Sequence, residues 1–156
     1  MTMKTLIILN STHRNNTKNV AEAMAEVTPV TIIDINDASS YNVGDYDIVG
    51  YGSGIYAGKF GKKIIEHIEN NIKDLNNVFI FSTSGTGNEK YNEKLVNYLN
   101  ENCKHVLGSF SCKGLCKWFI FALVGGIAKG HPSAEDFSKA QEFILSVVEK
   151  YSSTHK

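Results

Sequence analysis

The sequence carries no surplus of either charge and no apolar run of membrane-spanning length. Its 16 basic and 16 acidic residues cancel, so no long-range field draws the chain to nucleic acid or to an anionic membrane surface. The longest apolar stretch runs from Trp118 to Val124 and on through a glycine pair to Ala128. That is about half of what a helix needs to cross a bilayer. We therefore expect no nucleic-acid partner and no membrane span.

Cysteine is scarce, and a secretion signal is missing. The three cysteines are an odd number, and the apolar start of the chain is followed by polar residues without a small-residue cleavage site, which argues for a reducing compartment. Cys112 and Cys116 lie four residues apart, and His105 and His131 flank them irregularly. Structural zinc needs a more compact set of ligands. We expect a cytoplasmic protein with free thiols and no metal site.

Short apolar runs alternate with segments of helical periodicity along the whole chain, which predicts a parallel sheet covered on both faces. Apolar side chains recur at helical spacing in four segments, among them Val20, Met24 and Val27 in the first. Ser133 and Asp136 mark the start of the last helix. The polar segment from Asn36 to Tyr46 predicts a loop with little helix. Five strands are expected: Thr5 to Leu9, Thr31 to Ile35, Asp47 to Tyr51, Val78 to Phe81 and Val106 to Phe110.

Right-handed crossovers wind these strands into one α/β domain, a three-layer α/β/α sandwich over residues 1–156. The spacing of the strands does not fix their order in the sheet. Open sheets of this kind bind ligands at the carboxyl ends of their strands. The loops after the first, third and fourth strands are therefore the candidates for a site.

The loop after the first strand consists of seven consecutive residues that can form hydrogen bonds through their side chains: Ser11, Thr12, His13, Arg14, Asn15, Asn16 and Thr17. The first acidic residue of the chain, Glu22, comes only after them. Such a helix N-terminus attracts a phosphate group, whereas an ordinary helix cap accounts for only one of the hydroxyl residues. The loop lacks the Gly-Lys-Ser/Thr of a P-loop and the three glycines of the dinucleotide fingerprint. Nucleoside triphosphates and NAD are therefore not expected here.

Small and polar residues also follow the third and fourth strands. The stretch from Gly50 to Gly61 holds five glycines, which let the backbone approach a flat ligand, and Tyr56 offers a ring to stack on it. A tight turn with a surface tyrosine is the alternative. Ser82 to Tyr91 forms a small, polar loop in which Tyr91 fits the core face of the following helix. Together the three loops predict one site.

These motifs resemble those of flavodoxins and flavodoxin-like proteins. The resemblance rests on Ser-Thr-His-Arg-Asn-Asn-Thr, Gly-Ser-Gly-Ile-Tyr and Ser-Thr-Ser-Gly-Thr-Gly after the three strands, and the tail from Cys112 to Pro132 resembles short flavodoxin-like proteins. It implies the strand order 2-1-3-4-5 and FMN as cofactor. By position, the phosphate would be held by Ser11, Thr12, His13, Asn15, Asn16 and Thr17. The isoalloxazine would lie between Ser53, Gly54, Ile55 and Tyr56 on one side and Thr83, Ser84 and Gly85 on the other.

The resemblance further implies an electron carrier that works through the semiquinone and hydroquinone states of FMN. Its partners would be reductases and ferredoxin-dependent or other oxidoreductases. No catalytic residue is expected, because the flavin carries the chemistry.

The alternative is an enzyme of the same fold, such as a quinone reductase or a menaquinone-dependent protoporphyrinogen dehydrogenase. In such an enzyme Trp118 to Val124 would form a substrate or membrane-docking surface; otherwise these residues pack over the sheet edge. A response-regulator-like signalling domain would need paired acidic residues after the first strand and an aspartate after the third. The sequence has neither.

Overall fold

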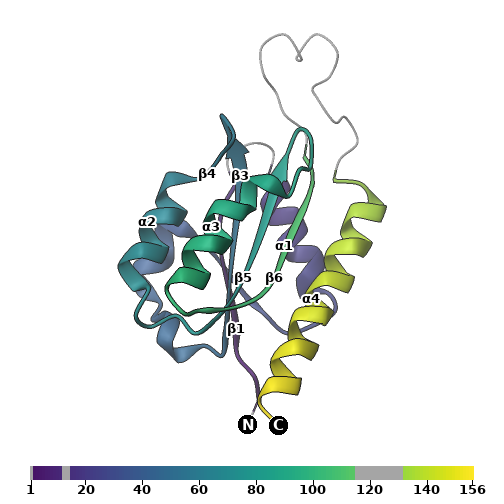
Figure 1. The fold of residues 1–156 in the computed structure, drawn as a ribbon. Coiled ribbons are helices and arrows are strands. Elements are labelled where there is room, and N and C mark those ends of the chain that lie inside the picture. Colours follow the sequence, from purple (N-terminus) through teal and green to yellow (C-terminus); the bar gives the residue numbers. More distant parts are fainter. Residues whose placement is uncertain (1, 12–14, 115–131) are drawn as a thin grey trace, which may run out of the picture.

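Five parallel strands carry the apolar runs of the sequence (Figure 1). The computed structural model describes residues 2–11, 15–114 and 132–156. The strands lie in the order β2-β1-β3-β5-β6, and the short β4 (Lys59–Phe60) pairs antiparallel with the end of β3. This confirms the predicted order 2-1-3-4-5 for the parallel strands. Their bounds are Thr5–Asn10 (β1), Thr31–Asp34 (β2), Ile48–Tyr56 (β3), Asn77–Ser84 (β5) and His105–Lys113 (β6).

Within the described residues, four α-helices cover the two faces of the sheet. Helices α1 (Asn16–Ala25) and α4 (Ala134–Thr154) lie on one face, and α2 (Lys62–Asn71) and α3 (Lys90–Glu101) lie on the other (Figure 1). The polar segment after β2 forms only two 3₁₀ helices, Ile35–Ser40 and Val43–Asp45, as its composition predicts. Within the described ranges, no helix is both long and apolar enough to span a membrane.

The predicted start of the last helix is confirmed, and the predicted end of the first is wrong. Ser133 and Asp136 form a reciprocal capping box at α4. Val27 lies beyond the end of α1 at Ala25 and is 38% exposed. Val27 is therefore not buried beside Met24, although the spacing of the two residues fits one face of a helix.

Side chains of each strand alternate between two buried clusters. Leu6 and Ile8 of β1 face α2 and α3, whereas Ile7 and Leu9 face α1 and α4. All four are buried, as expected for the interior of a parallel sheet with helices on both faces.

Two glycines of β3 serve the packing of this sheet. A Cβ on Gly50 would lie 2.1 Å from Cζ of Phe79, and a Cβ on Gly52 would lie 2.2 Å from Cζ of Phe81. Both aromatic rings are fully buried over the β3 backbone. These two glycines therefore make room for core rings, and only Gly54, Gly58 and Gly61 remain for the loop function that the sequence suggested for all five.

Side chains from the flanking helices bind two carbonyl groups of the edge strand β6. Asn92 Nδ2 donates to the carbonyl oxygen of Phe110 at 3.0 Å, and Lys150 Nζ donates to that of Leu107 at 3.1 Å. A register shift in β5 between Val78 and Phe79 interrupts the pairing nearby. Bulges and side-chain contacts of this kind protect an edge strand from pairing with another chain.

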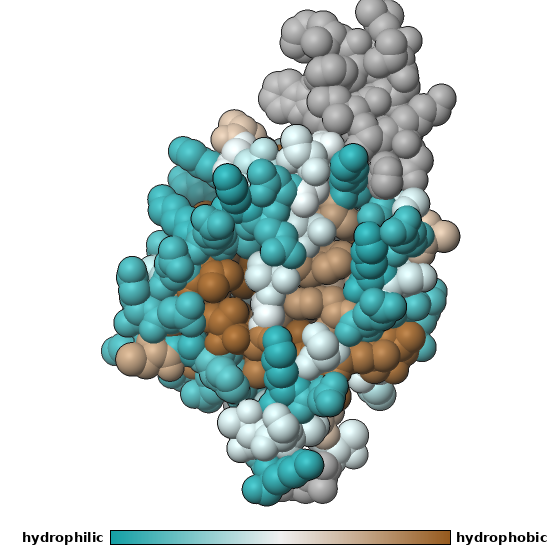
Figure 2. All heavy atoms as spheres, turned by 45° about the vertical axis from the view of Figure 1, so that its right-hand side comes forward, coloured by the Kyte–Doolittle hydropathy of each residue, from teal (hydrophilic) through white to brown (hydrophobic). Residues whose placement is uncertain are grey.

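Figure 2 shows apolar side chains grouped among hydrophilic ones on the side of the molecule that carries α4.

The turn between β3 and β4 contains a residue with a strained backbone conformation. Ala57 and Gly58 both have positive φ, 49° and 75°, as a two-residue type I′ hairpin requires. Alanine is strained in the left-handed region, whereas asparagine tolerates it. We expect Ala57→Asn to raise the free energy of unfolding by about 1 kcal/mol, measured by urea denaturation.

A matched variant completes this test. Ala57→Val should lower the same free energy, because a β-branched residue fits positive φ worse than alanine does. Equal stability of the two variants would contradict the strained turn.

A buried tyrosine and a half-buried histidine make stability depend on pH. The Tyr51 hydroxyl lies 3.0 Å from His67 Nδ1, and burial raises the pKa of Tyr51 and lowers the pKa of His67. The unfolded chain therefore binds a proton at His67 at a higher pH than the folded protein does. The resulting stability is present above the unfolded pKa of about 6.5 and is lost as pH falls below it. We expect the melting temperature of His67→Gln to fall less between pH 7.5 and pH 5.5 than that of the unaltered protein, and parallel curves would refute the assignment.

Candidate functional site

A row of polar residues crosses the sheet where its apolar core ends. The register places Asn10 of β1 opposite Ser53 of β3, Ser53 opposite Ser82 of β5, and Ser82 opposite Ser111 of β6. Ser53 and Ser82 are fully buried, and Ser82 Oγ donates to Ser111 Oγ at 3.1 Å. The change from apolar to polar residues thus occurs at one level in four strands. The three predicted loops begin at this level.

The loop after β1 delivers a helix end to this edge of the sheet. Asn15 has φ 56° and begins α1 without a side-chain cap, and the first turn of α1 holds no acidic residue. The backbone N–H of Lys18 is 3.5 Å from Ser11 Oγ. Asn16 and Thr17 are buried in the first turn. Of the predicted phosphate residues, Thr12 and His13 lie outside the described part of the chain.

Two other strand ends pack against this first turn. Thr17 Oγ1 lies 3.0 Å from Thr83 Oγ1 at the end of β5. A Cβ on Gly114, just after β6, would lie 2.8 Å from Asn16 Nδ2. The absence of a side chain at Gly114 therefore lets the end of β6 approach the first turn of α1. Gly114 is part of the tail that resembles short flavodoxin-like proteins, but its contact with Asn16 could not be predicted because it joins distant segments.

The predicted residues of β3 divide between the two faces of the sheet. Ser53 Oγ accepts a hydrogen bond from the backbone N–H of Gly61 at 2.9 Å and donates to the carbonyl oxygen of Gly54 at 2.6 Å. Ile55 is partly buried against the core under α2 and α3. On the other face, a Cβ on Gly54 would lie 2.7 Å from the Tyr56 hydroxyl. The Tyr56 side chain thus folds over Gly54, next to Thr83 in the register.

The loop after β5 is fixed by its own polar groups. The backbone N–H of Gly87 donates to Ser84 Oγ at 2.8 Å, and that of Gly114 donates to the Ser84 carbonyl oxygen at 2.8 Å. Gly87 has φ 67°, a conformation that glycine adopts without strain. Gly85 lies in the half-exposed turn between them. Thr83 thus contacts the first turn of α1, and Ser84 and Gly85 follow it in the chain.

Tyr91 was predicted to lie in the core and does not. It is half-buried, and its Cε1 lies 3.8 Å from the point where a Cβ on Gly58 would stand. The core under α3 contains Leu95 and Leu99 instead. Tyr91 therefore lies beside the hairpin turn at the rim of the site. Its spacing fits the core face, but its position in the first turn of α3 carries it to the edge.

The thiol of Cys112 lies near the site and is kept protonated. Burial, with the nearby charge of Asp136, raises the pKa of Cys112 to about 12. A neutral buried thiol is a poor nucleophile and metal ligand. Cys112 therefore acts as an apolar packing residue, and the predicted apolar surface from Trp118 to Val124 lies outside the described residues.

Comparison with known proteins assigns the family. A family model described as a flavodoxin domain matches residues 7–114, which include all three loops. The chain belongs to the flavodoxin domain family. It is also similar to an uncharacterized protein of Methanocaldococcus jannaschii, with 37% identity over 148 residues that cover 94% of this chain and 99% of that protein.

Solved flavodoxins share the fold of this flavodoxin domain. A flavodoxin from the domain Archaea is similar with a TM-score of 0.72 and 16% identity, covering 96% of this chain and 99% of that one. The two-electron reduced flavodoxin of Megasphaera elsdenii has a TM-score of 0.65 and 13% identity, with 92% and 98% covered. A short-chain flavodoxin associated with a bacterial microcompartment has a TM-score of 0.65 and 13% identity, with 96% and 99% covered. At these identities the likeness establishes the fold alone.

The contact between Thr17 and Thr83 generates a prediction about stability. Removing one hydroxyl leaves the other buried without its partner, whereas removing both leaves neither. We expect Thr17→Val and Thr83→Val each to lower the free energy of unfolding by about 1–3 kcal/mol. The double variant should lose clearly less than the sum. Additive losses in urea denaturation would show that the two hydroxyls do not interact.

Proposed function

We propose that this protein binds FMN and transfers electrons as a cytoplasmic carrier, with residues 1–156 forming one flavodoxin-like domain. The observation that carries the proposal is the start of α1. Asn15 gives it no side-chain cap and its first turn has no acidic residue, and the hydroxyl groups of Ser11 and Thr83 lie against this turn. A phosphate group suits this donor set, because helix N–H groups and the helix dipole favour an anion. The residues that would hold it are Ser11, Thr12, His13, Asn15, Asn16 and Thr17.

The flavin ring would lie between the two other loops. Gly54 and Tyr56 would contribute one side, Tyr56 through its ring and Gly54 through exposed backbone. Thr83, Ser84 and Gly85 would contribute the other. Ser53 and Ile55 would act through their backbone, since the Ser53 side chain bonds the N–H of Gly61 and the Ile55 side chain packs on the core. FMN, when bound, supplies the capacity to accept and donate electrons.

The protein itself would orient the ring and restrict water. Hydrogen bonds fix the loops on both sides: Ser53 to Gly61 on one and Ser84 to Gly87 on the other. A rigid site needs little rearrangement when charge on a bound group changes. Redox partner proteins, reductases and ferredoxin-dependent or other oxidoreductases, would deliver and remove the electrons.

A single charge placed in the phosphate loop tests this proposal. Asn15→Asp puts a carboxylate next to the bound phosphate and should weaken FMN binding about tenfold or more. The same change should preserve or raise the melting temperature, because an acidic residue at a helix N-terminus is favourable and aspartate tolerates positive φ. FMN affinity is measured by quenching of flavin fluorescence.

The matched control is Asn97→Asp, which adds the same charge on the exposed surface of α3. It should leave FMN affinity unchanged. A purified protein that is colourless and takes up no added FMN would overturn the proposed function. Equal FMN affinity of the two variants would show that the phosphate group is not bound in this loop.

A further inference from the structure

Lysines stand at the starts of the helices, where they oppose the helix dipole. In the described part of the chain, α1, α2 and α3 each hold lysine in the first turn, and none of the four α-helices has a basic residue in its last turn. Positive charge stabilises the C-terminal end of a helix and destabilises the N-terminal end. Helix stability therefore does not account for this placement. The first-turn lysines are Lys18, Lys62, Lys63 and Lys90.

The helix starts and the end of β6 bring lysines around the proposed flavin site. The β3–β4 hairpin and the starts of α2 and α3 lie at the same end of the molecule (Figure 1). Lys59 belongs to β4, and Lys90 precedes Tyr91, which lies beside the turn of the hairpin. In the loop after β5, a Cβ on Gly87 would lie 3.0 Å from the backbone nitrogen of Lys113. Both flavin loops therefore have lysine beside them.

Positive charge is in excess on this surface, which we call the basic face and define as residues 57–68, 85–96 and 111–114. These ranges hold six lysines and three glutamates, all of them exposed. Lys63 Nζ donates to Asn36 Oδ1 at 2.8 Å. The lysines of the basic face are Lys59, Lys62, Lys63, Lys90, Lys94 and Lys113.

Most of this charge is available to a partner. Among the described residues, the ammonium groups of Lys59, Lys90 and Lys113 have no hydrogen-bond or ion-pair partner. Lys62 Nζ lies 3.6 Å from Glu66 Oε1, with 90% and 53% of the two side chains exposed. An ion pair so exposed to water contributes little, and it can exchange for contacts with another molecule.

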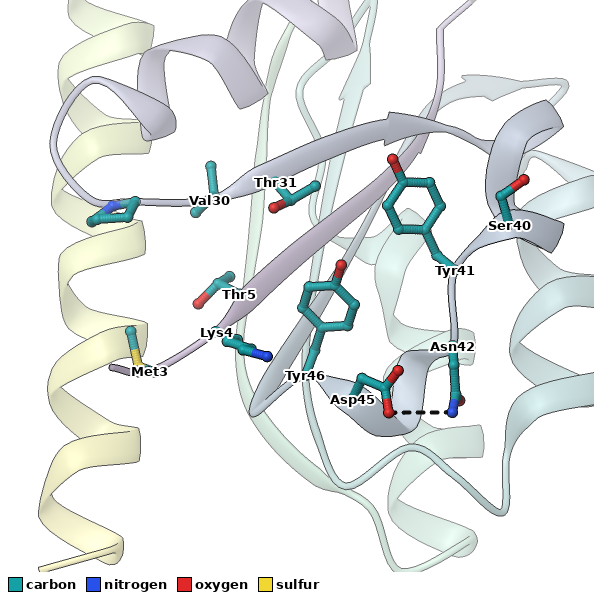
Figure 3. A pocket seen from close by; sticks show the side chains of 11 residues that line it. Met3, Lys4, Thr5, Val30, Thr31, Ser40, Tyr41, Asn42, Asp45 and Tyr46 are labelled. Atoms are coloured by element: carbon teal, nitrogen blue, oxygen red, sulfur yellow. Dashed lines mark hydrogen bonds between the residues drawn. The ribbon is translucent and has the colours of Figure 1, made fainter. Parts of the chain in front are cut away.

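The opposite ends of the strands and helices lack this excess. Residues 69–76 and 97–104, at the ends of α2 and α3, hold three acidic residues and two lysines. At the starts of β1 and β2, a cavity of about 480 Å³ is lined by one lysine and one aspartate, Lys4 and Asp45 (Figure 3). Because the chain as a whole is neutral, the lysine excess is a local property of the basic face.

The basic face suits an acidic protein better than an anionic membrane. Glu89 and Lys90, and then Glu93 and Lys94, alternate in sign, whereas anionic lipid is bound by uniform cationic clusters. Attachment to a membrane surface also relies on exposed apolar side chains. The large apolar side chains that are exposed in the described residues lie elsewhere: Val27, Tyr41 and Leu145.

We propose that the basic face docks an acidic surface of a redox partner protein. Complementary charge would steer the two proteins together and orient the partner toward the loops after β3 and β5. The inference rests on the proposed function for the redox role of the partner, because these loops would hold the flavin. The charges themselves belong to the chain, so docking does not require bound FMN.

Titration of the full-length protein with poly-L-glutamate, with and without FMN, tests the docking charge. By calorimetry, poly-L-glutamate should bind both forms at low salt, and its affinity should fall as the salt concentration rises. Poly-L-lysine should bind about tenfold more weakly or less. Vesicles of phosphatidylserine and phosphatidylcholine should not cosediment with the protein.

Lys90→Glu separates docking from folding. It should weaken poly-L-glutamate binding about threefold to tenfold. Its melting temperature should stay unchanged or rise, because glutamate suits a helix N-terminus and pairs with Lys94 one turn later. The matched control is Lys73→Glu, an equal change of charge at an exposed position just beyond the other end of α2. It should leave the affinity unchanged.

Electron transfer to small acceptors connects the basic face with the flavin. The reduced, FMN-loaded protein gives one electron to ferricyanide, a trianion, or one to tris(phenanthroline)cobalt(III), a trication. Lys90→Glu should slow the first reaction about threefold and accelerate the second, whereas Lys73→Glu should change neither rate.

The outcomes distinguish this inference from the proposed function. Equal binding of the two polymers, cosedimentation with the vesicles, or equal behaviour of Lys90→Glu and Lys73→Glu would overturn the docking inference and leave FMN binding intact. A protein that binds poly-L-glutamate but takes up no FMN would overturn the proposed function, and with it the redox role of the partner.

Discussion

The N-terminal end of α1 is the constraint around which the carboxyl edge of the sheet is arranged. A helix needs partners for its first N–H groups. Here Asn15 forms no side-chain cap and the first turn holds no acidic residue, and Ser11 Oγ accepts from the N–H of Lys18 at 3.5 Å. The ends of two strands pack around this helix end. Thr83 reaches Thr17 from the end of β5, and Gly114 approaches Asn16 from the end of β6. The chain keeps a concentration of donors and positive potential at one place.

The strands of the sheet determine the level at which the buried core ends and the polar loops begin. Buried apolar residues predominate in β1, β3 and β5 up to one row, and from Asn10 across to Ser111 the row is polar. Close packing below the row depends on Gly50 and Gly52, whose missing side chains admit the rings of Phe79 and Phe81. A sheet that is closely packed below and polar above places the polar loops on a rigid base. The site therefore follows from the core.

Much of the architecture could be predicted because parallel strands buried on both faces leave a plain signal. Their polar ends, such as Ser84 and Lys113, could not be assigned, since hydrogen bonding in the sheet continues after the apolar pattern stops. The positions of the loop motifs were also predictable. Which face each residue presents was not: Ser53 turns toward Gly61, and Tyr91 lies beside Gly58. Those outcomes depend on register and on contacts between segments distant in the sequence.

The central claim is that a phosphate group anchors the ligand at the start of α1, and comparing FMN with riboflavin tests it most directly. The two share the same ring and differ in the phosphate alone. If the claim is right, the apoprotein binds FMN about 100-fold more tightly than riboflavin, and raising the salt concentration narrows the difference. Equal affinity for the two, at any salt concentration, would contradict the account.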